Sequence, residues 1–105
     1  MSGVALVTGA ARGIGAATVA GLVEAGWRVV AVDRCSDDPA LDYGLGTAAE
    51  LAAVVTAGGD RVVGVAADVR HPDHLERAVA AAEERWGGLD AAIGAAGVIA
   101  YRMIA

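Results

Sequence analysis

The feature that most restricts the fold of this chain is a glycine-rich stretch, Thr-Gly-Ala-Ala-Arg-Gly-Ile-Gly, at residues 8–15. It directly follows the short apolar run Val4–Val7 and leads into a segment with helical spacing. Glycine loses more backbone freedom on folding than any other residue, so three glycines within seven positions need a structural reason. A strand that turns sharply into a closely packed helix supplies that reason.

Apolar runs alternate with helical patterns along the rest of the chain. Four runs are short, nearly continuous and rich in small or β-branched residues, as is typical of strands covered on both faces of a parallel sheet. This β-α-β-α-β-α-β order predicts a three-layer α/β/α fold, in which a sheet of four parallel strands with right-handed crossovers has helices on both faces. The predicted strands are Val4–Val7, Val29–Val32, Val62–Val65 and Leu89–Ile93.

Three helices are predicted between these strands. The first covers Gly13–Ala25, and Gly26 follows it where a left-handed cap belongs. The second begins at Thr47, because Thr47-Ala48-Ala49-Glu50 matches a capping box, and the third begins at Pro72. The residues expected on the packing faces are Ile14, Ala17, Thr18, Gly21, Leu22 and Ala25 in the first helix, Ala48, Leu51, Val54 and Val55 in the second, and Leu75, Ala78, Val79, Ala82 and Trp86 in the third.

Composition excludes several classes of protein. The net charge of −5 and the scattered arginines argue against a nucleic-acid partner. Cys35 is the only cysteine, which excludes a disulfide framework and fits a reducing compartment. No metal site is predicted, because His71 and His74 flank a helix start and are typical of solvated cap residues. No signal peptide or membrane-spanning stretch is recognisable, so we expect a soluble cytoplasmic protein without a membrane partner.

A second feature of the sequence, the acidic residue Asp33, supports the interpretation of the glycine turn as part of a binding site. Asp33 ends the second predicted strand, where a carboxylate can accept hydrogen bonds from both hydroxyls of an adenosine ribose. Gly9 would permit the tight turn, Gly15 would let the helix pack against the strand, and Gly13 would let a pyrophosphate approach the helix N-terminus. The combination predicts a dinucleotide site. The alternative is a glycine turn with an aspartate that caps its own loop.

The choice between the two nicotinamide dinucleotides depends on charge. Asp33 favours NAD, because the 2′-phosphate of NADP would meet a like charge. Arg34 directly follows and could receive that phosphate, as could Arg12, so NADP remains the alternative cofactor.

The glycine spacing resembles that of the short-chain dehydrogenase/reductase family, which implies a Rossmann-like, incomplete doubly wound sheet of four parallel strands in the order 3-2-1-4. The resemblance extends from Val4 to about Ala100. It includes Asp68-Val69, Leu89-Asp90 and the stretch at 94–97, which reads Gly-Ala-Ala-Gly where the family usually has Asn-Asn-Ala-Gly. The resemblance implies that Asp68 contacts the adenine amino group, although a helix-side cap stays open for Asp68 and is preferred for Asp90. The expected cofactor contacts are Thr8, Gly9, Ala11, Arg12, Gly13, Ile14, Gly15, Asp33, Arg34, Asp68, Val69, Ala95, Ala96 and Gly97.

A long segment, residues 34–46, separates the second predicted strand from its helix. Loops at such positions usually have about 2–6 residues, so this one is interpreted as an insertion within the domain. It resembles the corresponding insertion of the mycofactocin-dependent dehydrogenases, which implies that it folds over the bound dinucleotide, with Leu41 or Tyr43 near the adenosine.

The catalytic group of the family is a Tyr-x-x-x-Lys pair with a preceding serine. The tyrosine transfers the proton in the exchange between an alcohol and a carbonyl compound, and the serine positions the carbonyl. The chain contains no lysine, Tyr101 has Ala105 four residues on, and from Tyr101 the sequence no longer resembles the family. No catalytic residue is therefore predicted. We expect residues 1–105 to be the cofactor half of an NAD-dependent oxidoreductase, inactive alone and truncated after the fourth strand. Alternatives are a non-catalytic NAD-binding module and a structural subunit completed by another chain.

The predicted sheet order leaves the fourth strand, expected to extend from Leu89 to Ala95, at an edge without a partner. Because its side chains are almost all apolar or small, such an edge favours pairing with a second copy of the chain. The sequence therefore predicts a homo-oligomer.

Overall fold

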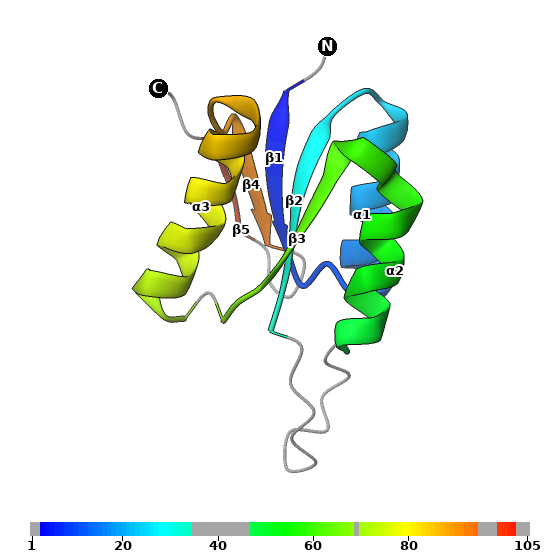
Figure 1. Ribbon diagram of the computed structural model, residues 1–105, viewed down its shortest axis with the longest axis horizontal. Coiled ribbons are helices and arrows are strands. Elements are labelled where there is room, and N and C mark those ends of the chain that lie inside the picture. Colours follow the sequence, from blue (N-terminus) through cyan, green and yellow to red (C-terminus); the bar gives the residue numbers. More distant parts are fainter. Residues whose placement is uncertain (1–2, 35–46, 69, 95–98, 103–105) are drawn as a thin grey trace.

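The computed structural model describes residues 3–34, 47–68, 70–94 and 99–102. These residues form a single sheet in the order β3-β2-β1-β4-β5, with helices on both faces (Figure 1). The strands are β1 (Val4–Thr8), β2 (Arg28–Asp33), β3 (Val62–Ala66), β4 (Ala91–Gly94) and β5 (Ile99–Arg102).

The first four strands are parallel, which confirms the predicted Rossmann-like α/β fold with the order 3-2-1-4. Thr8 is level with Val32 of β2 and Gly94 of β4, while Asp33 is level with Ala66 of β3. The carboxyl ends of all four strands therefore meet along one edge of the sheet, the lower edge in Figure 1. This shared edge is where the glycine turn, Asp33 and Asp68 converge.

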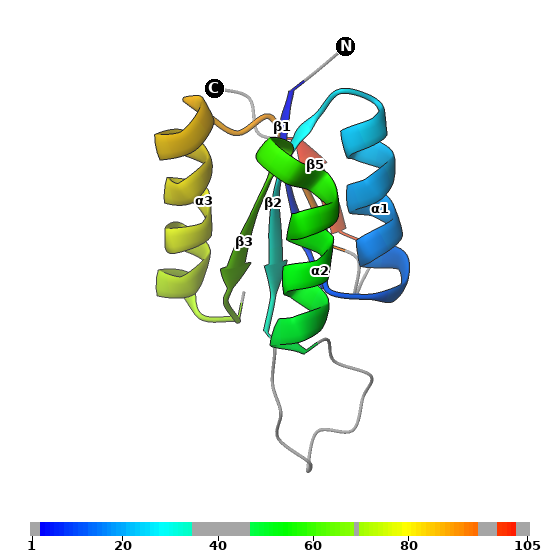
Figure 2. The ribbon, with the colours of Figure 1, turned by 45° about the vertical axis from the view of Figure 1, so that its right-hand side comes forward.

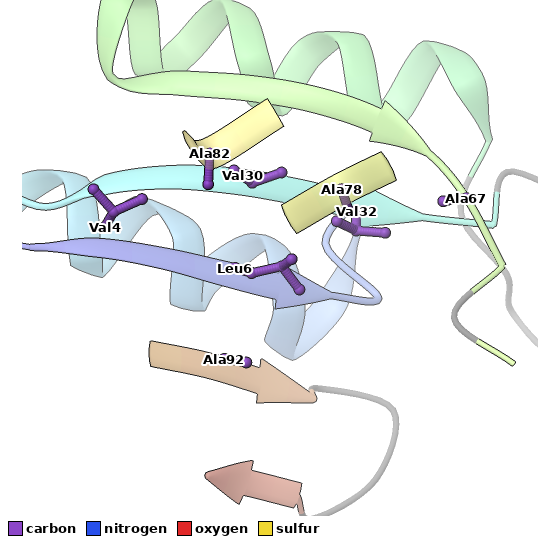
Figure 3. Packing of buried hydrophobic residues seen from close by; sticks show 8 residues of the cluster. All are labelled: Val4, Leu6, Val30, Val32, Ala67, Ala78, Ala82 and Ala92. Carbon is purple, nitrogen blue, oxygen red and sulfur yellow. The ribbon is translucent and has the colours of Figure 1, made fainter. Parts of the chain in front are cut away.

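The three described helices cover the two faces unequally. Helices α1 (Gly13–Glu24) and α2 (Ala48–Gly58) pack on one face, and α3 (Pro72–Trp86) packs on the other (Figure 2). Successive strand residues point to opposite faces, so β1 to β4 each contribute to both cores. The core under α3 contains the buried residues Val4, Leu6, Val30, Val32, Ala67, Ala78, Ala82 and Ala92 (Figure 3), and the core under α1 and α2 contains Val7, Ala10, Ala11, Val19, Val29, Ala31, Leu51 and Val62.

The expected packing face of α1 is confirmed at Leu22, which is half-buried and packs against the core, but is wrong at four of its six positions. The side chain of Ile14 is 76% exposed, and Ala17, Gly21 and Ala25 are also exposed. The buried residues of this helix are Gly15 and Val19. An alanine-rich helix has weak periodicity, and the close approach of Gly15 to the strand decides which side faces the sheet. The packing faces predicted for α2 and α3 are confirmed at Leu51, Ala78 and Ala82, whereas Ala48 is exposed.

The predicted outer edge of the sheet is also wrong. β5 pairs antiparallel with β4, so that Gly94 lies opposite Ile99 and Ala91 opposite Arg102. The outer backbone groups of β4 therefore have an intramolecular partner, and the expectation of self-association through this strand loses its basis.

Within the described residues, no helix is long and apolar enough to cross a membrane.

The predicted capping box at the start of α2 is confirmed. The Glu50 backbone N–H donates to Thr47 Oγ1 (3.1 Å), and the Thr47 N–H donates to Glu50 Oε1 (3.0 Å). We expect Thr47→Ala to lower the free energy of unfolding by about 1 kcal/mol, because one amide at the helix start loses its acceptor. Urea denaturation followed by circular dichroism measures this. The matched control is Thr56→Ala on an exposed position of the same helix, which should be neutral or slightly stabilising; an equal loss in both variants would contradict a capping role.

Candidate functional site

The glycine turn between β1 and α1 depends on two left-handed backbone positions. Gly9 has φ 67° and Gly13 has φ 62°, which residues with a side chain rarely adopt. The Ala10 N–H donates to the Val32 carbonyl (3.0 Å), which fastens the turn to β2. At Gly15 an added Cβ would overlap the Gly9 carbonyl oxygen and lie 2.6 Å from its carbon. The predicted tight turn at Gly9 and close packing at Gly15 are both present.

The N-terminus of α1 differs from those of the other described helices. α2 has its capping box, and α3 has Pro72 and Asp73 in its first turn. α1 has neither a side-chain cap nor an acidic residue in its first turn. The first amides of a helix and the positive end of its dipole attract anions. An added Cβ at Gly13 would meet no atom within 4 Å, so this helix start is open to an approaching anion.

Asp33 lies at the end of β2, beside the turn. Its side chain is buried, and Oδ2 accepts a hydrogen bond from the Ala11 N–H (3.0 Å). Its carbonyl accepts from the Ala67 N–H (2.9 Å), which links the ends of β2 and β3. The carboxylate therefore braces the glycine turn, which lies between β1 and α1, whereas the alternative from the sequence had Asp33 cap its own loop. This contact also fixes the carboxylate at the strand end, where a ribose is expected in the dinucleotide interpretation.

Asp68 is the centre of a charged cluster just beyond β3. Its side chain is 12% exposed and lies 3.4 Å from Arg34 Nε and 2.7 Å from Arg70 Nη2 (both to Oδ2), with His71 Nε2 at 3.9 Å. The Arg70 N–H and Nε also donate to Oδ1, each at 3.0 Å. Hydrogen bonds from the Arg70 side chain and backbone, with the charge of Arg34, hold the pKa of the Asp68 carboxyl well below its usual range. The carboxylate is therefore charged at neutral pH.

Sequence reasoning missed two partners of this cluster. His74 Nδ1 accepts a hydrogen bond from the Asp68 N–H (3.0 Å), so the imidazole positions the Asp68 backbone; this requires the Nδ1 atom to be unprotonated. Arg70 was not singled out at all, although it makes the shortest ion pair with Asp68. The sequence could have suggested the contact with Arg70, because this arginine follows Asp68 by only two positions. The interpretation of His74 as a solvated cap residue is wrong, because its side chain is half-buried and bonded.

Asp90 has a structural role. Its Oδ2 accepts from the Val4 N–H (2.8 Å), and its own N–H donates to the Val4 carbonyl (2.8 Å). The preferred interpretation of Asp90 as a helix-side cap is wrong, because its carboxylate caps the first amide of β1 and not a helix end. Asp90 lies at the opposite edge of the sheet from the glycine turn, since it precedes β4.

The described members of the predicted site share one edge of the sheet. Thr8 ends β1 and is half-buried, Ala11 is buried under the turn, and Arg12 and Ile14 are exposed at the start of α1. Asp33, Arg34 and Asp68 follow at the ends of β2 and β3. Val69, Ala95, Ala96 and Gly97 lie outside the described residues, as do Cys35, Leu41 and Tyr43.

Four neighbouring strands of this sheet are parallel, the first turns through glycines into an uncapped helix, and an acidic residue ends the second. These features define the Rossmann class of α/β proteins. Within this class the chain belongs to the short-chain dehydrogenase family, whose sequence profile matches residues 3–105. The match includes residues 101–105, so the expectation that the resemblance ends near Ala100 is wrong.

Individual relatives and solved structures agree with this family. The chain is 42% identical over 101 residues to the short-chain reductase protein NovJ of Streptomyces niveus, covering 96% of this chain and 35% of the relative. It is 41% identical over 98 residues to cis-1,2-dihydrobenzene-1,2-diol dehydrogenase of Pseudomonas putida, covering 93% and 31%. The crystal structure of carveol dehydrogenase from Mycobacterium avium in complex with NAD superposes with a TM-score of 0.80 at 34% identity, covering 93% of this chain and 36% of that one. The chain thus spans about a third of the length of these proteins.

Proposed function

We propose that this chain binds NAD and is the cofactor-binding part of an oxidoreductase of the short-chain dehydrogenase type. The observation that carries the proposal is the open, uncapped start of α1 at Gly13, next to a fixed carboxylate at Asp33. A pyrophosphate fits the first feature and an adenosine ribose the second. When bound, the nicotinamide would supply a hydride donor or acceptor for an alcohol or carbonyl substrate.

Seven of the described site residues have a proposed role toward the dinucleotide. Gly13, Ile14 and Gly15 would present backbone N–H groups to the pyrophosphate, and Thr8 and Gly9 would form the floor of the turn beneath it. Asp33 would accept hydrogen bonds from the ribose hydroxyls, and Asp68 would face the adenine. The crystal structure of 3-ketoacyl-(acyl-carrier-protein) reductase from Brucella melitensis complexed with NADH, at a TM-score of 0.70 and 32% identity, is consistent with an NAD-type cofactor.

Binding without turnover is the proposed activity of the 105-residue chain, since it has no lysine to complete a Tyr-x-x-x-Lys pair. The identity of the substrate is not part of the proposal. Membership of the mycofactocin-dependent subgroup is a further proposal, supported by the length and composition of segment 34–46.

The test of NAD binding is a side chain placed in the path of the pyrophosphate. We expect calorimetry to detect NAD binding to the parent chain and a loss of about tenfold or more in Gly13→Asn, because charge-assisted contacts to the phosphates are blocked. An added Cβ at this position meets no protein atom within 4 Å. The matched control is Gly87→Asn, at the end of α3, where φ is 82° and the space is also open.

Both substitutions impose a left-handed conformation on a residue with a side chain, at a cost of about 1–2 kcal/mol. They should therefore lower the melting temperature by similar amounts, and only Gly13→Asn should weaken NAD. Absence of NAD binding in the parent chain, or equal binding by the two variants, would contradict the proposal.

A further inference from the structure

Arg34, one of the two arginines that could receive the 2′-phosphate of NADP, is already engaged in an ion pair. Arg34 directly follows Asp33, and its Nε lies 3.4 Å from Asp68 Oδ2. The Arg34 side chain is 33% exposed and the Asp68 side chain 12%, so this pair is partly shielded from solvent. The hydrogen bond between the Ala67 N–H and the Asp33 carbonyl keeps the two strand ends adjacent. The sheet thus places the two residues next to each other.

Asp68 is itself held firmly. Arg70 donates to both of its carboxylate oxygens, and the Asp68 N–H is bonded to His74 Nδ1. The Asp68 carboxylate also remains ionised, because these contacts lower its pKa. A fixed, charged carboxylate is a good anchor for a second guanidinium.

We propose that Asp68 acts as an anchor that holds Arg34 toward β3 and thereby makes the site select against a 2′-phosphate. The proposal rests on the proposed NAD site and adds a specificity-determining residue to it. Selection then has two parts. Asp33 repels the phosphate, and Asp68 forms an ion pair with Arg34, whose guanidinium would otherwise neutralise the phosphate.

The proposal predicts the effect of removing the charge of Asp68 while keeping its size. The probes are ADP-ribose and 2′-phospho-ADP-ribose, which differ only in the 2′-phosphate and need only the adenosine side of the site. We expect Asp68→Asn to raise the affinity for the phosphorylated probe relative to ADP-ribose by about tenfold, because the released Arg34 gains a charge-assisted contact. Any contact of residue 68 with adenine is common to both probes and cancels in the ratio.

Two controls separate the anchor from a general change of charge. Arg70→Gln removes the other guanidinium on Asp68 but leaves the Arg34–Asp68 pair, so the ratio should stay within about twofold of the parent. The double variant Asp68→Asn/Arg34→Gln should lose the gain entirely. An unchanged ratio in Asp68→Asn, or a gain that persists in the double variant, would overturn the proposal.

A second variant keeps the proposal testable even if Asp68→Asn does not fold. Arg34→Gln alone should leave the ratio nearly unchanged, because the guanidinium is already committed to Asp68 in the parent. A fall in the affinity for 2′-phospho-ADP-ribose in this variant would show that Arg34 already contacts the phosphate, and would overturn the anchor. If the parent binds neither probe, the proposed function fails together with this inference; if it binds ADP-ribose and the ratios do not respond, only the inference fails.

Discussion

Gly15→Ala should destabilise this protein severely and remove its binding of ADP-ribose. The added methyl group would overlap the Gly9 carbonyl oxygen and lie 3.0 Å from Ala10 Cα, and these are backbone atoms that cannot rotate away as a side chain can. Either α1 must move off β1 or the turn must change shape. Overpacking of this kind costs about 1–3 kcal/mol and occasionally more, and we expect the upper part of that range. Urea denaturation and a calorimetric titration of ADP-ribose measure the two effects.

The matched control for this variant is Gly21→Ala in the same helix. An added Cβ there would meet no atom within 4 Å, and the position is exposed. Because alanine is the better helix former, the control should gain about 0.5–1 kcal/mol in the free energy of unfolding. The two variants carry the same chemical change, so opposite signs would isolate the close helix–strand contact. A Gly15→Ala variant as stable as the parent would show that the contact can relax at little cost.

Asp33→Ala should weaken both the fold and the binding site. The Ala11 N–H, which donates to Asp33 Oδ2 in a buried environment, would lose its acceptor, at a cost of about 1–3 kcal/mol. The proposed ribose contacts would be lost as well, so the affinity for ADP-ribose should fall by about tenfold or more. Chemical denaturation and calorimetry of the same preparations separate these effects.

Asp33→Asn separates the structural role of Asp33 in the glycine turn from its proposed role in binding the ribose. Its amide oxygen can still accept from the Ala11 N–H, so most of the stability should return. Its lost charge should nevertheless narrow the difference in affinity between ADP-ribose and 2′-phospho-ADP-ribose. A parent chain that binds both probes equally would refute Asp33 as a selector, whatever the stability of the variants.

Those parts of the fold that have local signals were predictable from the sequence. The strands β1 to β3 appear as short apolar runs, and the start of α2 at Thr47 has the capping-box pattern. The side of α1 that faces the sheet was not predictable, because a helix rich in alanine and glycine has small residues on every side. β5 was not predicted either, since an antiparallel return depends on pairing with β4 and leaves no periodic pattern of its own.

The candidate site was predictable in part for the same reason. Gly9, Gly13 and Gly15 have a fixed spacing, and Asp33 ends an evident strand. The pairing of Arg34 with Asp68 follows from the register of β2 against β3, which brings together residues 34 positions apart. The bond from the Asp68 N–H to His74 requires the chain to fold back over the start of α3. Neither contact can be predicted from a short stretch of the sequence.

The binding site lies along the carboxyl ends of the parallel strands, so its stability depends on the folding of the whole sheet. The glycine turn is bonded to β2 through Ala10 and Val32, and β2 is bonded onward to the segment after β3 through Asp33 and Ala67. A dinucleotide that touches the turn, Asp33 and Asp68 would connect regions that no short piece of the chain contains. Its binding free energy is therefore linked to the folding of the whole sheet, and the melting temperature should rise with ligand concentration as mass action requires. Saturation with cofactor would then raise the free energy of unfolding of a chain whose helices are rich in alanine and glycine.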